Sequence, residues 1–133
     1  MNKDIRWKQR FINFEKAFNH PAEAVARGHY DALAQAGLIQ MFEVAFELAW
    51  KTLKDKLEFE GQSTNSPREV IKAAFQSGYL GDGAAWIEAL DNRNLPAHTY
   101  DQKKSDEVRD LILSRYFPLI KALYVRLKKE IAG

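Results

Sequence analysis

Apolar residues recur along the chain at intervals of three and four, the spacing that lines one face of a helix. The first such stripe consists of four aromatic residues: Trp7, Phe11, Phe14 and Phe18. Because Pro21 and then Gly28 interrupt the pattern, the stretch from Pro21 to Arg27 is either a kinked continuation of this helix or a separate turn. The pattern predicts a first helix over the aromatic stripe and leaves its end open.

The longest helical pattern runs from about Asp31 to Phe59 and is apolar over a broad face. Six apolar residues mark this face and two more widen it: Phe42, Ala45, Phe46, Ala49, Leu53 and Leu57, with Met41 and Leu48. Such breadth indicates a central helix that packs on more than one neighbour. Gly61 is well placed to end it, because glycine readily adopts the left-handed conformation that follows many helices.

Two shorter helices are expected next. The segment from Ser66 to Glu69 has the order of a capping box, with an N-cap serine, a proline in the first helical position and a glutamate in the third. This helix should end near Gly78. After the break at Gly81 to Gly83 a short helix follows, and Pro96 should stop it near Asn94, because the residue before a proline avoids the helical conformation.

A last long helix follows a polar segment from Asp101 to Asp106. Its expected buried face carries six apolar residues: Leu113, Tyr116, Phe117, Ile120, Leu123 and Leu127. Pro118 should bend it, because proline cannot donate the helical hydrogen bond. The sequence contains neither strand-like alternation nor an internal repeat. It therefore predicts an all-α fold, an up-and-down helical bundle of about five helices forming one domain over residues 1–133.

Composition narrows the classes of function. With 133 residues, 46% of them hydrophobic, the chain can build one core without disulfides. The absence of cysteine excludes thiolate metal sites and favours a reducing cytoplasm. No apolar run approaches the roughly 18 residues that a membrane span needs. A net charge of +2 lacks the strong field of a duplex-DNA binder, although a local basic patch can still hold a few phosphates.

Groups suited to phosphate chemistry gather at the expected helix end, where Arg93 and Asn94 are followed by His98 and Tyr100. A guanidinium can hold a phosphodiester and stabilise the extra charge of its transition state, and a histidine can move a proton near neutrality. In RNA, a base that takes the proton from a 2′-OH lets that oxygen attack the adjacent phosphorus. Such cleavage would need neither a metal nor a covalent enzyme intermediate.

Spacing alone favours a simpler interpretation of the same residues. Arg93 would pair with Asp91 or with a neighbouring helix, His98 would be an ordinary loop residue, and Tyr100 would cover the end of the bundle. One arginine and one histidine at a single interval recur by chance in many helical proteins. The wider sequence context therefore has to decide between the two interpretations.

That context resembles the HEPN family of small helical ribonucleases. The segment Arg93 to His98 is similar to their motif of arginine, polar residue, spacer and histidine. Thr99 and Tyr100 extend it to the arginine-x4-histidine-x-tyrosine form of HepT-like toxins, which are paired with a minimal nucleotidyltransferase and are also described as nucleotidyltransferase substrate-binding proteins. Further similarity lies in Phe42 to Lys54, in Ser66 to Ile71, and in Trp86 upstream of Asp91 to Asn94, and it is weakest from His20 to Gly37.

The resemblance implies a metal-independent endoribonuclease toxin that uses no cofactor. In the homodimer that it implies, the two motifs face one another across a shared cleft, with Arg93 and His98 as catalytic residues and Asn94 in support. A partner nucleotidyltransferase antitoxin is implied to inactivate the toxin by attaching AMP to Tyr100. The alternatives are a non-catalytic subunit that presents substrate or nucleotide to the nucleotidyltransferase, and a purely structural helical dimer. A proton-transfer group beside a phosphate clamp favours the enzyme.

Two acidic residues on the central helix complete the candidates. For Glu43 and Glu47 the ordinary explanation is a helix surface, with Glu47 paired to Lys51 four residues on, and a role facing the cleft is the alternative. A divalent ion held by both carboxylates with His98 is less favoured, because oxygen-rich metal sites usually collect more ligands. Trp50 and Trp86 are expected to lie in the core or in dimer contacts.

Overall fold

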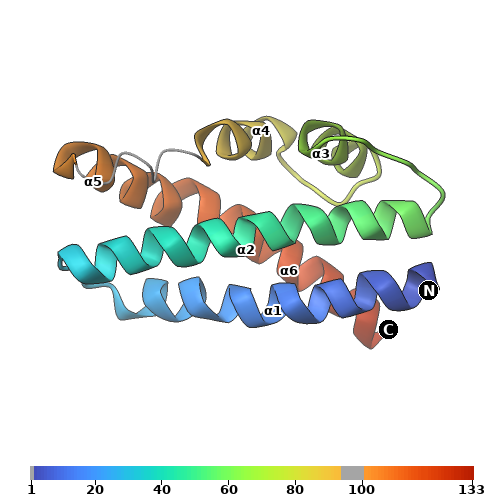
Figure 1. The fold of residues 1–133 in the computed structure, drawn as a ribbon, viewed down its shortest axis with the longest axis horizontal. Coiled ribbons are helices and arrows are strands. Elements are labelled where there is room, and N and C mark those ends of the chain that lie inside the picture. The colour runs from blue at the N-terminus through green and yellow to red at the C-terminus, as the bar shows by residue number, and fades with distance from the viewer. Residues whose placement is uncertain (1, 94–100) are drawn as a thin grey trace.

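The computed structural model describes residues 2–93 and 101–133. Its elements, in chain order, are helices α1 (Lys3–Arg27), α2 (Ala32–Phe59), α3 (Pro67–Gln76), α4 (Gly83–Asn92) and α5 (Gln102–Leu111), the π-helical segment η2 (Ile112–Tyr116) and helix α6 (Phe117–Ala132). Figure 1 shows α1 and α2 side by side, α3 and α4 along the opposite side of α2, and α6 crossing behind α2. The expected all-α bundle is confirmed.

Helix α1 is fixed to the bundle by its aromatic stripe. All four predicted aromatics are buried, and two of them, Phe11 and Phe18, stack on Tyr124 of α6 with ring centroids 5.7 and 4.4 Å away. The Tyr124 hydroxyl donates to Glu15 at 2.5 Å, and the Lys128 ammonium donates to the same carboxylate at 2.7 Å. Helix α1 is therefore joined to α6 by its aromatic stripe and by the hydrogen bonds of Glu15 with Tyr124 and Lys128.

The open question about Pro21 is settled in favour of continuity. Helix α1 runs through Pro21, which is itself buried, and ends at Arg27. Proline costs the helix one backbone hydrogen bond there, and burial of the ring against the core offsets part of this loss. Gly28 ends the helix in the left-handed conformation, with a φ of 74°, which a residue with a side chain rarely adopts.

Helix α2 is the centre of the bundle, as its broad apolar face predicts. By length and composition alone it would also pass for a membrane-spanning helix, which the sequence pattern did not reveal. In this structure its apolar residues pack on α1, α3 and α6. The face is narrower than expected, because Met41 is 38% exposed, whereas Phe42 and Phe46 are buried.

Helices α3 and α4 form a short pair on α2. The Ser66 hydroxyl accepts from the Glu69 N–H at 3.2 Å, as a capping box requires. The Glu69 carboxylate accepts in return from the Asn65 N–H at 2.6 Å, one residue before the N-cap serine whose N–H the usual capping box would use. Trp86 of α4 is 1% exposed and stacks on Phe46 of α2, with ring centroids 5.6 Å apart. This tryptophan anchors α4 to the central helix.

The start of the last helical stretch was predicted wrongly. The last helix was expected to follow the polar segment from Asp101 to Asp106, but helix α5 already begins at Gln102, within that segment. The Asp101 carboxylate caps it by accepting from the Lys103 and Lys104 N–H groups at 3.0 and 3.4 Å. A side-chain cap at the helix start stabilises a sequence with few apolar residues, and the expectation had overlooked this aspartate.

A π-helical segment interrupts the same stretch just before Pro118. Here the Phe117 N–H donates to the Ile112 carbonyl, five residues back instead of four. Ile120 lies twelve positions after Val108, which in an uninterrupted α-helix corresponds to three full turns and about 120° more. The π segment takes up one extra residue, so the side chains of Val108 and Ile120 lie on the same face. Ile112 is consequently buried in place of the expected Leu113.

Candidate functional site

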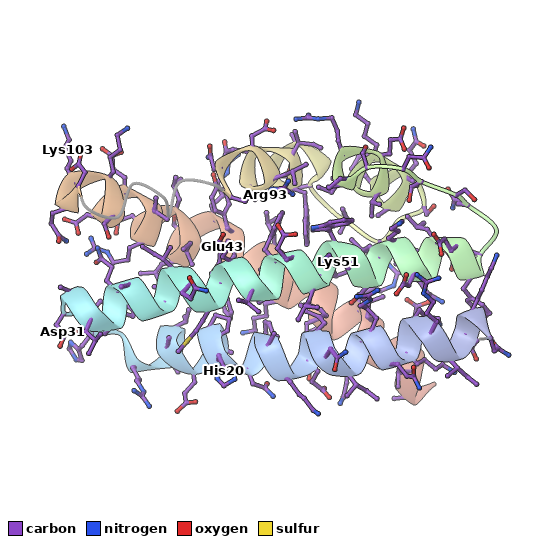
Figure 2. The ribbon with its side chains drawn as sticks, in the orientation of Figure 1. His20, Asp31, Glu43, Lys51, Arg93 and Lys103 are labelled. Carbon is purple, nitrogen blue, oxygen red and sulfur yellow. The ribbon has the colours of Figure 1, made fainter. Side chains whose placement is uncertain are left out.

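Arg93 is the first residue beyond α4, and its N–H donates to the Leu90 carbonyl at 3.3 Å. Figure 2 shows Arg93 at this helix end, on the side of α4 that faces α2, with Glu43 on the nearby part of α2. The helix therefore stops where Pro96 led us to expect. The other predicted site residues, Asn94, His98 and Tyr100, lie outside the described residues.

Glu47 of α2 is the acidic neighbour of Arg93. One carboxylate oxygen, Oε1, lies 3.5 Å from the Arg93 Nη1 atom, and the other, Oε2, accepts from the Trp50 indole N–H at 2.8 Å. The expected surface pair of Glu47 with Lys51 is therefore replaced by contacts with an arginine from another helix and with a tryptophan. The Lys51 ammonium instead lies 5.9 Å from the centre of the Trp50 ring.

The contact between Glu47 and Arg93 is electrostatic, because no hydrogen bond joins the two side chains in the described part of the chain. The Arg93 Nη1 atom is buried and finds no hydrogen-bond acceptor in residues 2–93 or 101–133. A guanidinium carries five N–H donors. Arg93 is thus held near a carboxylate through its buried Nη1 atom, and the rest of its side chain, which is 32% exposed overall, can donate to an anion that approaches from solvent.

Of the two partners that the simpler interpretation gave Arg93, the structure shows the neighbouring helix, through Glu47 of α2, and not Asp91. The Asp91 carboxylate accepts from Arg68 of α3 at 2.6 Å. The side chains of Arg68 and Asp91 are about half exposed, so we expect this pair to contribute little to stability. The pair nevertheless keeps the Asp91 carboxylate, the acidic group nearest to Arg93 in sequence, bound to Arg68.

Arg93 lies between an open hollow and a narrow cavity. The hollow has a volume of about 420 Å³ and is lined by the start of α3 and the end of α4, including Arg68 and Asp91. The cavity, of about 20 Å³, is mostly apolar, with Glu43, Asn92 and Tyr116 as further polar residues in its lining. Arg93 therefore lines both a hollow from which an anion can approach and a narrow cavity beside buried residues.

Sequence reasoning missed a polar group behind this helix end. The Tyr116 hydroxyl accepts from the Asn92 side-chain amide at 2.6 Å and donates to Glu88 at 2.9 Å, and Glu88 also accepts from Arg115 at 2.9 Å. Burial is the main cause that raises the pKa of Tyr116, so the hydroxyl keeps its proton. The available signal was Glu88 and Asn92, four residues apart on one face of the helix.

Glu43 and Glu47 were also considered as part of a metal site. In the described ranges, no cluster of three or more histidine, aspartate or glutamate side chains lies close enough to hold an ion. His98, the third ligand considered, lies outside those ranges. The contacts observed for Glu47 point instead to a carboxylate that accompanies Arg93.

Comparison with known proteins places this chain in a family. A family model described as "Nucleotidyltransferase substrate binding protein like" matches residues 9–129. The chain belongs to this family. The resemblance seen in the sequence is thereby confirmed, and the family's name associates the chain with a nucleotidyltransferase.

Individual relatives of this family agree with the assignment. A protein of Haemophilus influenzae named "Probable ribonuclease HepT" is 35% identical over 75 residues, which are 53% of this chain and 51% of that protein. The match thus spans about half the length of this relative. A crystal structure from Thermus thermophilus is 30% identical, with a TM-score of 0.78, over 86% of this chain and 98% of that one.

A second solved structure supports the fold alone. It comes from Haemophilus influenzae and is described as showing the fold of a substrate-binding domain of a nucleotidyltransferase. It is 24% identical, has a TM-score of 0.64, and covers 96% of this chain and 99% of that one. The family's helical bundle therefore accounts for nearly the whole chain.

Proposed function

We propose that the chain is a metal-independent endoribonuclease toxin that acts as a cytoplasmic homodimer. The observation that carries this proposal is the position of Arg93, which lines a hollow, lies 3.5 Å from the Glu47 carboxylate and has a side chain that is 32% exposed. It is followed at the motif's spacing by His98. The name of the Haemophilus influenzae relative, a probable ribonuclease, supports the same activity.

The proposed reaction needs only groups of the protein and of RNA. His98 takes the proton of a ribose 2′-OH, and the 2′-oxygen attacks the adjacent phosphorus while the bond from phosphorus to the 5′-oxygen breaks. Arg93 stabilises the charge that accumulates on the phosphoryl oxygens. His98 of the second copy protonates the departing 5′-oxygen. The products are a 2′,3′-cyclic phosphate and a 5′-hydroxyl end.

The partner in this proposal is a small nucleotidyltransferase that acts as antitoxin. It transfers AMP from ATP to the Tyr100 hydroxyl and releases pyrophosphate. The added phosphate places a negative charge two residues from His98, where it competes with RNA for Arg93. The family's name supports the association with a nucleotidyltransferase.

Cleavage of RNA by the purified protein tests the activity. Wild-type protein is expected to cut RNA equally well with and without EDTA, and to leave 2′,3′-cyclic phosphate ends. His98→Ala and Arg93→Ala should each lose at least about a hundredfold in kcat, because each removes a group that acts on the transition state. A DNA strand of the same sequence is the matched substrate control, because it lacks the 2′-OH. Wild-type activity in both variants would contradict the proposal.

Intact mass spectrometry tests the regulation. After incubation with the partner nucleotidyltransferase and ATP, the chain is expected to gain the mass of one or more AMP groups and to lose RNase activity. Tyr100→Phe should gain no mass and stay active, since it lacks the acceptor hydroxyl. Tyr30→Phe, which alters a tyrosine far from the motif in sequence, is the matched control. Modification that persists in Tyr100→Phe would exclude this tyrosine as the sole acceptor.

A second candidate function is supported by the family's name, which speaks of substrate binding. In that case the chain would present substrate or nucleotide to the nucleotidyltransferase without turnover. The EDTA experiment separates the two functions, because a binding subunit would leave RNA intact at every protein concentration. Binding of RNA without cleavage would favour this alternative.

A further inference from the structure

The position of Arg93 depends on the last turn of α4. Its backbone lies one residue past Asn92, where the helix ends, and the Arg93 N–H makes only a 3.3 Å bond to the Leu90 carbonyl. Helix ends fray when nothing holds them. The groups that fix Asn92 therefore also set where the guanidinium lies relative to the hollow and to Glu47.

One hydroxyl group holds this last turn at two points. Tyr116 accepts from Asn92 at 2.6 Å and donates to Glu88, one turn earlier on α4, at 2.9 Å. Arg115 binds the same Glu88 carboxylate oxygen at 2.9 Å, which adds a second link from η2 to α4. The end of α4 is thus tied to the π-helical segment by two neighbouring side chains of η2.

The tyrosine is itself rigidly placed. Its residue is 4% exposed, and its ring lies against Phe42 of α2, with centroids 6.2 Å apart and an angle of 25° between the planes. A neutral hydroxyl can accept from an amide and donate to a carboxylate at once, as it does here. Single-turn π segments often occur at functional sites. Here the π-helical turn of η2 rotates the chain so that the Tyr116 hydroxyl lies within hydrogen-bond distance of α4.

We propose that Tyr116 is a positioning residue for Arg93, acting through Asn92. It touches neither the guanidinium nor a substrate in this assignment. It fixes the helix end so that the guanidinium points at the phosphate from a constant place, while Glu47 holds the charged group from α2. The inference rests on the proposed ribonuclease function for its effect on rate, and on the geometry alone for its effect on Arg93.

Removing the hydroxyl while keeping the ring tests the assignment. Tyr116→Phe is expected to lower kcat on RNA about tenfold with little change in KM, because a small displacement of a group that acts in the transition state is costly. Asn92→Leu, which leaves Tyr116 in place, should do the same. The double variant should lose no more than Tyr116→Phe alone, because the phenylalanine already removes the bond to Asn92. Losses that multiply would overturn the assignment.

Tyr124→Phe is the matched control. Its hydroxyl also binds a carboxylate, but on α1, and its ring is likewise stacked in the aromatic core. It should keep the wild-type kcat. Equal losses in Tyr116→Phe and Tyr124→Phe would mean a general effect of removing a core hydroxyl, and would overturn the positioning role.

A second readout does not depend on turnover. The NMR signal of the Arg93 side-chain Nε–H should shift or broaden in Tyr116→Phe and stay unchanged in Tyr124→Phe. If wild-type protein cuts no RNA, the ribonuclease proposal fails, and this signal still decides whether Tyr116 positions Arg93. An unchanged Arg93 signal in Tyr116→Phe would overturn the inference even in an active enzyme.

Discussion

Arg93→Lys is expected to lose about a hundredfold or more in kcat on RNA although it keeps the positive charge. A guanidinium presents a planar fork of donors that matches two phosphoryl oxygens, whereas an ammonium is a point charge. Removing one donor aimed at a transition-state oxyanion already costs about two to three powers of ten. Glu47 lies beside this position and can also capture the single ammonium, which leaves no second donor group for the phosphate.

Arg68→Lys provides the matched control for this experiment. Arg68 lines the same hollow, but it is engaged with Asp91 and belongs to α3. Its replacement should change kcat by less than about threefold, since a surface pair contributes little. Kinetics at constant ionic strength, with salt titrated separately, would show whether charge alone matters. If Arg93→Lys kept most of its activity, Arg93 would contribute only its positive charge and not the paired donors of its guanidinium.

Trp86→Ala is expected to lower the free energy of unfolding by about 3–5 kcal/mol, the usual cost of deleting a large buried aromatic side chain. Trp86 is 1% exposed and is the main aromatic contact from α4 to Phe46 of α2. That loss is a large share of the about 5–15 kcal/mol that stabilises a typical domain. Urea unfolding followed by circular dichroism measures it, with the slope of the transition checked for two-state behaviour.

Leu33→Ala is the control for this stability measurement. Leu33 is also a large apolar residue in a helix, but it is 83% exposed, so its loss should change the free energy of unfolding by about 0.5 kcal/mol or less. A cost for Trp86→Ala near that of Leu33→Ala would show that α4 is not anchored through this side chain. The position of Arg93 would then need another explanation.

Helical periodicity and caps predicted most of the fold. The aromatic stripe of α1, the broad face of α2 and the start of α3 at Pro67 were read correctly, because each depends on neighbours in sequence. Asp101 was overlooked as a cap, so the last helix was expected to begin only after Asp106. Leu113 was placed in the core because an α-helical period was applied across a π segment.

The candidate site was predicted to a smaller extent. Arg93 could be singled out from the motif, but its partner Glu47 lies 46 positions earlier on another helix, and a local rule assigned that carboxylate to Lys51 instead. The link from Tyr116 to Asn92 spans 24 positions. Contacts of this kind depend on how helices pack, and nothing in the local spacing specifies them. Roles for Asn94, His98 and Tyr100 remain predictions from the motif.

Because of the π-helical turn, the number of residues in the last helical stretch determines which of its side chains face the core. Between Val108 and Ile120, deleting or inserting one residue would rotate everything beyond it by about 100° and carry the core side chains of α6 away from α1. The number of residues in the connection 60–66 does not affect which side chains face the core, because this connection only has to span the distance from α2 to α3. Homologous sequences that differ in length should therefore differ in that connection and keep the spacing of the last helical stretch unchanged.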